Sequence, residues 1–129
     1  MVGARVIGSD IEEKMIRGCK KTLDYYNIKD YKLYSLDIGT INKHLNNVDA
    51  VVTDLPYGKS TTTKGENRND LYNRSFKAIS QVLKKDSKAV IGLYDKNLIS
   101  IGKKYMKLVE IHKFVAHKSL TRFFAVFQK

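Results

Sequence analysis

Cysteine, proline and long apolar runs are scarce in this chain of 129 residues, and each scarcity excludes a class of protein. The one cysteine, Cys19, cannot form an internal disulfide, so the chain is not a disulfide-stapled secreted domain and suits a reducing compartment such as the cytoplasm. No apolar run approaches the length of a membrane span, about 20 residues, and no signal peptide is recognisable. The histidines, His44, His112 and His117, have no neighbours at metal-ligand spacing, so we expect no metal site.

Acidic residues are also few. The chain has 13 Asp and Glu against 24 Lys and Arg, which gives a formal net charge of +11 and a pI near 9.7. Such an excess favours a polyanionic partner, and nucleic acid before a membrane, because no lysine-rich stretch has the strongly apolar opposite face of a membrane anchor. Surface lysines that only solubilise the protein are the alternative. With 43% hydrophobic and 29% charged residues, the composition otherwise suits one globular domain over 1–129.

The most informative stretch is 48–58, Val-Asp-Ala-Val-Val-Thr-Asp-Leu-Pro-Tyr-Gly. Its apolar, β-branched run predicts a strand that is buried on both faces and stops at Asp54. Pro56, the one proline of the chain, and Gly58 then turn the backbone, so that Asp54 and Tyr57 lie at the carboxyl end of a strand. In open α/β sheets, ligands bind at that edge.

The residues after this strand suit the binding of a planar ring that carries an exocyclic amine. The Asp54 carboxylate and the Leu55 carbonyl can each accept one N–H of the amine, while Tyr57 can stack on the ring. Stacking combined with hydrogen bonds to the base edge is how enzymes hold a nucleobase outside its helix. The pattern is short, and an ordinary strand with a proline turn explains it equally well.

Strands and helices alternate along the rest of the chain, which predicts a mainly parallel sheet with right-handed crossovers and an antiparallel hairpin at one edge. Cys19 falls on the apolar face of the first helix, where we expect it to pack in the core. The expected elements are strands at 4–9, 31–36, 48–53 and 89–94, helices at 11–26, 71–83 and 97–104, a helical turn at 40–46, and a hairpin of 108–115 with 120–127.

Asp10, Asp37 and Asp54 each end a predicted strand. If these strands are parallel, the carboxylates line one edge of the sheet. A carboxylate in such a place can accept the hydroxyls of a ribose, as in dinucleotide-binding folds. Capping of a following helix is the alternative, and it suits Asp10 best.

The stretch 54–58, Asp-Leu-Pro-Tyr-Gly, resembles the Asp/Asn-Pro-Pro-Tyr/Phe signature of S-adenosylmethionine-dependent methyltransferases that modify exocyclic amino groups. Together with 8–10, Gly-Ser-Asp, with Asp37 and with 117–122, His-Lys-Ser-Leu-Thr-Arg, it resembles the archaeal tRNA guanine-N2 methyltransferases, which modify the guanosine at position ten of tRNA. The resemblance spans nearly the whole chain but only the carboxyl part of that catalytic domain. It implies the class I methyltransferase fold, a Rossmann-like α/β sheet, without its first strand and glycine-rich loop.

The resemblance also implies roles in methyl transfer from S-adenosylmethionine to guanine N2. The turn that faces the target base would supply the catalytic residues Asp54, Leu55, Pro56 and Tyr57, with Leu55 in place of the commoner first proline. Asp10 would hold the cofactor ribose and Asp37 its adenine amino group, within a set of cofactor contacts made of Asp10, Ile11, Asp37, Ile38 and Asp54. Basic residues on the polar loop and by the hairpin are candidate RNA phosphate contacts: Lys59, Lys64, Arg68, Lys118 and Arg122.

The chain begins after parts that the family has. A first strand with its glycine-rich loop and helix, together roughly 30 residues, would precede the strand that ends at Asp10, and an amino-terminal RNA-binding region of the THUMP type would precede that. Because the first strand normally lies between the strands that end at Asp10 and Asp54, we expect a gap in the sheet. Either those strands pair directly, or a second chain or a dimer mate fills the gap, or the chain is one piece of a split or truncated enzyme. The isolated chain should then bind the cofactor weakly or not at all.

Other functions are compatible with the sequence. An adenine-N6 methyltransferase would use the same signature, and only the Ser-Leu-Thr-Arg match at 119–122 favours tRNA. A non-catalytic, basic RNA-binding subunit on a methyltransferase scaffold would explain the missing glycine loop but not the retained turn at 54–57. A receiver-like signalling domain would place Asp10, Asp54 and Lys96 near strand ends, but it has no use for a Pro-Tyr pair.

Overall fold

The computed structural model describes residues 3–56, 66–117 and 120–129. Tyr57, Lys59, Lys64 and Lys118, which the sequence assigns to the site, lie outside the described residues. The elements are β1 (Val6–Asp10), α1 (Glu13–Tyr25), β2 (Tyr31–Ser35), the 3-10 helix η1 (Ile38–Lys43), β3 (Val48–Asp54), α2 (Arg68–Val82), β4 (Leu83–Leu93), the 3-10 helix η2 (Lys96–Leu98), α3 (Ile99–Gly102), β5 (Lys107–His117) and β6 (Leu120–Gln128). In these ranges no helix is both long and apolar enough to cross a membrane.

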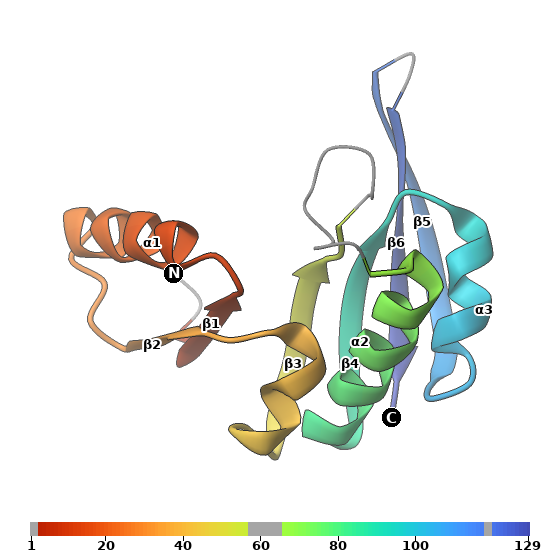
Figure 1. The fold of residues 1–129 in the computed structure, drawn as a ribbon, viewed down its shortest axis with the longest axis horizontal. Helices are drawn as coiled ribbons and strands as arrows, with labels where there is room; N and C mark the ends of the chain where they lie inside the picture. Colours follow the sequence, from red (N-terminus) through yellow and green to blue (C-terminus); the bar gives the residue numbers. More distant parts are fainter. Residues whose placement is uncertain (1–2, 57–65, 118–119) are drawn as a thin grey trace.

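The strands form two separate sheets (Figure 1). β1 and β2 pair in parallel, with Asp10 opposite Ser35. The second sheet has the order β3-β4-β6-β5, in which β3 is parallel to β4 and β6 is antiparallel to both of its neighbours. Within the described ranges β1 and β3 do not pair, so the gap expected from the sequence is present. The alternative expectation, that these two strands pair directly, is wrong.

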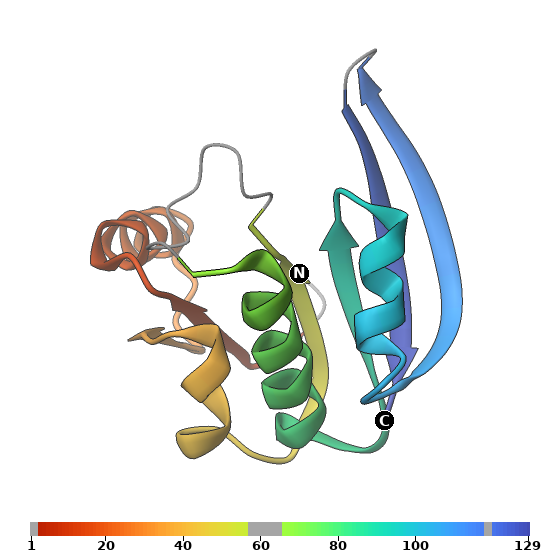
Figure 2. The same ribbon diagram turned by 45° about the vertical axis from the view of Figure 1, so that its right-hand side comes forward.

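The core lies between α2 and the four-stranded sheet. The apolar residues of α2 recur every three or four positions, and Tyr72, Phe76 and Ile79 are fully buried. The rings of Phe76 and Phe127 meet edge to face with centroids 5.3 Å apart. Figures 1 and 2 show α2 and α3 side by side on one face of this sheet.

The observed boundaries differ from the expected ones where an apolar pattern fits two structures. Leu83 follows the helical period but begins β4, which runs over 11 residues and is longer than the expected strand. The helix expected at 97–104 is a 3-10 turn followed by the single turn of α3.

The amino-terminal helix and β3 leave apolar side chains uncovered. α1 contacts β1 and β2 but has no buried residue, and Cys19 is exposed, so its expected place in the core is wrong. Val52 of β3 is 80% exposed, so this strand is not buried on both faces. Both exposures have the same cause, which is a lack of covering elements. In the described part of the chain β3 has a neighbouring strand on one side only, and α1 has just two strands beneath it.

η1 connects the two sheets. Ile41 of η1 is buried in the core beside α2, and the Asn42 amide donates to the Gln81 side chain at 2.8 Å. Figure 1 shows β1, β2 and α1 as a unit on the far side of η1 from the hairpin. The position of this unit relative to the main sheet is therefore set through η1 and α2.

Candidate active site at the carboxyl ends of the strands

The turn after β3 is held firmly from two sides. The Leu55 N–H donates to the Gly92 carbonyl of β4 at 3.4 Å, and the Leu55 side chain is only 3% exposed. The buried Tyr72 of α2 donates its hydroxyl to the Pro56 carbonyl at 3.0 Å. Asp54, the last residue of β3, is thereby presented at the surface with its side chain 47% exposed.

Gly92 makes room for the Asp54 carboxylate. The two residues are register partners in the parallel pair of β3 and β4, and a Cβ at position 92 would overlap Asp54 Oδ1. Glycine therefore lets the carboxylate lie against the neighbouring strand. The sequence assigned no role to Gly92, although a glycine inside the run Ala-Val-Ile-Gly-Leu signals a close approach of this kind.

Arg122 reaches the same carboxylate from β6. Its Nη1 lies 3.3 Å from Asp54 Oδ2, and the two side chains are 32% and 47% exposed. An ion pair so open to water contributes at most about 1 kcal/mol to stability, so its main effect is to orient the carboxylate. The structure thus places Arg122 beside the turn after β3, whereas its contact with an RNA phosphate stays a prediction.

Asp37 is engaged by its own protein. It precedes η1, and its Oδ1 accepts the Gly39 N–H at 2.7 Å as a helix cap. Arg74 of α2 donates to both Asp37 oxygens, with 2.9 Å between Nη2 and Oδ2, and to both Glu66 oxygens at 2.7 and 2.8 Å. These hydrogen bonds, above all those to Glu66 and then those to Asp37, raise the pKa of the Arg74 guanidinium. Only part of the Asp37 carboxylate remains to accept from a ligand.

Asp10 is the last residue of β1, and its position suits the ribose contact expected of it. Its Oδ1 accepts the Glu12 N–H at 2.7 Å just before α1, and its backbone carbonyl accepts the Leu36 N–H at 3.0 Å. Asp10 and Asp37 therefore share the carboxyl edge of the two-stranded sheet. Of their expected companions, Ile11 is 43% exposed and Ile38 packs against the core.

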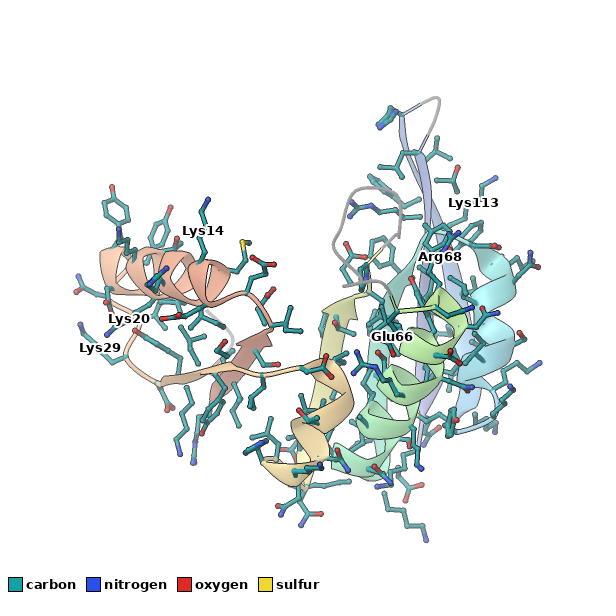
Figure 3. The ribbon with its side chains drawn as sticks, in the orientation of Figure 1. Lys14, Lys20, Lys29, Glu66, Arg68 and Lys113 are labelled. Atoms are coloured by element: carbon teal, nitrogen blue, oxygen red, sulfur yellow. The ribbon has the colours of Figure 1, made fainter. Side chains whose placement is uncertain are left out.

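Arg68 opens α2 and contacts an aromatic residue that the sequence reading missed. Its Nη1 donates to the Tyr94 hydroxyl at 2.8 Å, and its guanidinium carbon lies 5.9 Å from the centre of the Tyr94 ring. Figure 3 shows Arg68 and Glu66 together at the amino-terminal end of α2. Tyr94 follows β4 directly, so its place at the end of a strand is the signal that could have identified it.

Comparison with known proteins gives a consistent result. Residues 2–123 match the family model described as RMKL-like, methyltransferase domain. A "Probable tRNA (guanine(10)-N2)-dimethyltransferase" from Methanothermococcus thermolithotrophicus is 36% identical over 99% of this chain and 77% of its own length. The tRNA (guanine(10)-N2)-dimethyltransferases of Methanothermobacter thermautotrophicus and Methanocaldococcus jannaschii are 30% and 33% identical over 100% of this chain, which spans only 38% and 36% of their lengths.

Solved structures share the fold. TrmN from Thermus thermophilus superposes with a TM-score of 0.78 at 13% identity, over 95% of this chain and 36% of TrmN. A Streptococcus mutans protein classed as a methyltransferase, in complex with SAH, gives 0.75 at 18% identity, over 97% of this chain and 76% of its own. At these identities the likeness establishes the fold alone, and it confirms the Rossmann-like α/β class expected from the sequence.

Proposed function

Because the chain belongs to the RMKL-like methyltransferase domain family, we propose that it serves in the transfer of a methyl group to the exocyclic N2 amine of guanine in tRNA. The observation that carries the proposal is the rigid Asp54-Leu55-Pro56 turn, fixed by Gly92 and Tyr72 at the carboxyl end of β3. The names of the relatives support tRNA as the substrate. A tRNA substrate in turn suits a cytoplasmic protein.

The turn activates and orients the amine. The guanine N2 amine is a poor nucleophile because its lone pair is delocalised into the ring. Hydrogen bonds from its two N–H groups to the Asp54 carboxylate and the Leu55 carbonyl favour a tetrahedral nitrogen and aim its lone pair. The nitrogen would gain a bond to the methyl carbon as the carbon–sulfur bond of the sulfonium breaks, which leaves a neutral thioether, and the Asp54 carboxylate could accept the proton that the nitrogen loses. Tyr57, which lies outside the described residues, would stack on the base.

S-adenosylmethionine supplies the electrophilic methyl group when it is bound, and the residues present fit its nucleoside part. Asp10 uses one carboxylate oxygen for the Glu12 N–H and has further lone pairs for a ribose hydroxyl. The exposed Ile11 offers an apolar surface beside it. The adenine contact of Asp37 has less capacity, because Arg74 and Gly39 already donate to this carboxylate.

We also infer that a strand from a second chain, or from a dimer mate, pairs between β1 and β3. Within the described ranges both strands present an open edge, which is a template for further pairing. Apolar side chains beside the gap are exposed, among them Val6 at 50% and Val52 at 80%. Protection of the β1 and β3 edge amides against hydrogen exchange, together with a dimeric mass by light scattering, would support this partner. Fast exchange in a monomer would contradict it.

Two measurements test the function. Calorimetry of S-adenosylmethionine binding should show at most a weak affinity in this chain alone, and Asp10→Ala should abolish it. Transfer of labelled methyl to an unmodified tRNA transcript should then yield N2-methylguanosine on digestion. Methylation at adenine N6 would identify the alternative substrate, and cofactor binding without transfer to any RNA would contradict the proposal.

A further inference from the structure

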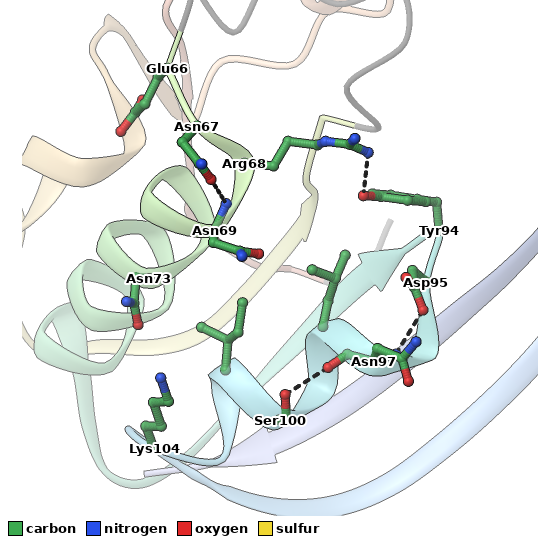
Figure 4. Close-up of a pocket in the computed structure, with 12 residues that line it drawn as sticks. Glu66, Asn67, Arg68, Asn69, Asn73, Tyr94, Asp95, Asn97, Ser100 and Lys104 are labelled. Atoms are coloured by element: carbon green, nitrogen blue, oxygen red, sulfur yellow. Dashed lines mark hydrogen bonds between the residues drawn. The ribbon is translucent and has the colours of Figure 1, made fainter.

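A polar pocket of about 770 Å³ opens between the first turns of α2 and the segment 94–104 (Figure 4). Its volume lies within the range of small-molecule sites, about 300–1,000 Å³. Asn69 and Asn73 of α2 form one wall, and Tyr94 and Asn97 form the other. Arg68, which the sequence assigns to RNA contact, lines this pocket.

Asparagine amides dominate the lining. Asn67, Asn69, Asn73 and Asn97 each carry a donor and an acceptor side by side, the pattern that matches the edge of a nucleobase. Two of them are held in place, because Asn67 Oδ1 accepts the Asn69 N–H at 2.8 Å and Asn73 Oδ1 accepts the Tyr105 hydroxyl at 3.0 Å. These bonds fix the amides in orientation and keep their NH₂ groups as donors.

The pocket has two cations, Arg68 and Lys104, in its lining. Its two carboxylates are bound differently, because Glu66 accepts from the guanidinium of Arg74 at 2.7 and 2.8 Å, whereas Asp95 accepts the Asn97 N–H at 2.8 Å. Figure 4 shows the cations Arg68 and Lys104 at opposite ends, with Asn69 and Asn73 between them. Cations at two places in one pocket can each contact a phosphate of the same strand.

Stacking surfaces complete the site. The Arg68 guanidinium lies 5.9 Å from the centre of the Tyr94 ring, and a planar cation beside an aromatic ring is a platform for a base. Leu98 and Ile101 add an apolar floor. Oriented amides, two cations and a stacking platform thus line one cavity.

The pocket adjoins the catalytic turn. Tyr94 stands two positions after Gly92, the register partner of Asp54. Tyr72, which holds the Pro56 carbonyl, packs edge to face on Tyr94 with ring centroids 6.5 Å apart. A base withdrawn from an RNA helix leaves its neighbours unstacked, and these need another surface.

We propose that this pocket binds one unpaired nucleotide of the RNA substrate next to the target base, with its base on the asparagine amides and its phosphates at Arg68 and Lys104. The proposal rests on the proposed function for the identity of the substrate. It assigns the pocket a task separate from methyl transfer, namely to hold the strand beside the catalytic turn.

The test follows the side-chain amide signals of Asn69 and Asn97 by ¹H–¹⁵N NMR while AMP, GMP, CMP or UMP is added to the whole chain. We expect saturable shifts of these signals. Lys104→Glu and Asn69→Leu should each weaken binding about tenfold, the effect of losing one hydrogen bond to a charged or polar partner. Lys103→Glu and Asn46→Leu are the matched controls, because both residues are exposed and lie outside the pocket.

The other outcomes are equally decisive. Shifts that inorganic phosphate alone reproduces at the same concentration would mean a simple anion site and would overturn the proposal, as would equal losses in the control variants. If nucleotides do not shift these signals in a chain that still methylates tRNA, the role proposed for the pocket is overturned and the proposed function stands. Nucleotide binding in a chain that methylates no RNA would support the pocket as a nucleotide site and contradict the proposed function.

Discussion

Arg74 donates hydrogen bonds to both carboxylate oxygens of Asp37, a residue 37 positions earlier in the chain. The same guanidinium binds both oxygens of Glu66, just before α2. This contact ties the helix that covers the main sheet to the loop that leaves β2. The place of Asp37, the expected adenine contact, is therefore set by α2 rather than by its own strand.

Replacement of Arg74 should loosen that connection. Arg74→Met removes four hydrogen bonds at a site about one-third exposed. We expect the free energy of unfolding to fall by about 1–2 kcal/mol. Arg74→Lys should recover little, because an ammonium cannot form the two planar forks. Denaturant titration of both variants measures the loss in the free energy of unfolding. A loss equal to that of the exposed control Lys77→Met would show that the network is without consequence.

Asp54→Ala should abolish methyl transfer while S-adenosylmethionine affinity stays within about threefold. The carboxylate is expected to bind the amine only as transfer proceeds, and the loss of such an acceptor costs about 10²–10³ in rate. Asp49→Ala is the control on the same strand, since Asp49 is 86% exposed and faces Lys84. Full transfer by the Asp54 variant would remove this residue from the mechanism.

Gly92→Ala should reduce transfer without unfolding the protein. The added Cβ displaces the Asp54 carboxylate, which is half exposed and can move, so the rate should fall about tenfold or more while stability changes by about 1 kcal/mol or less. Gly18→Ala is the matched control, because nothing lies within 4 Å of the added Cβ in α1. Single-turnover rates and thermal melts distinguish the two effects. Unchanged transfer would show that the position of the carboxylate is uncritical.

Charge reversal at Arg68 should weaken tRNA binding and flatten its dependence on salt. Each lost phosphate contact lowers the slope of log affinity against log salt by about 0.7–0.9. Lys77→Glu, on the same helix but outside the pocket, makes the same charge change at an exposed residue. Electrophoretic mobility shifts over a salt series measure both slopes. Equal slopes would assign Arg68 to the general charge of the surface.

The sequence predicted the order of the strands and helices well, but it predicted poorly which side chains are buried. The strand ending at Asp54 could be placed because an apolar run stopped by Pro56 has few interpretations. Cys19 and Val52 were misplaced because an apolar pattern shows that a side chain needs cover, but not whether the covering element belongs to the same stretch of chain. Arg74 was missed for a different reason: on a helix it reads as a surface cation, and its partner Asp37 is distant in sequence.

The separation of the two sheets has a consequence for cooperativity. The unit made of β1, α1 and β2 buries no helical residue and has a sheet of only two strands, an arrangement with little stability of its own. The main sheet, by contrast, has a continuous core around Phe76 and Phe127. The amino-terminal unit should therefore open at a lower free energy than the rest, as a separate foldon. Pairing of a further strand with the open edge of β1 would then be a folding event, in which binding and the ordering of Asp10 occur as one step.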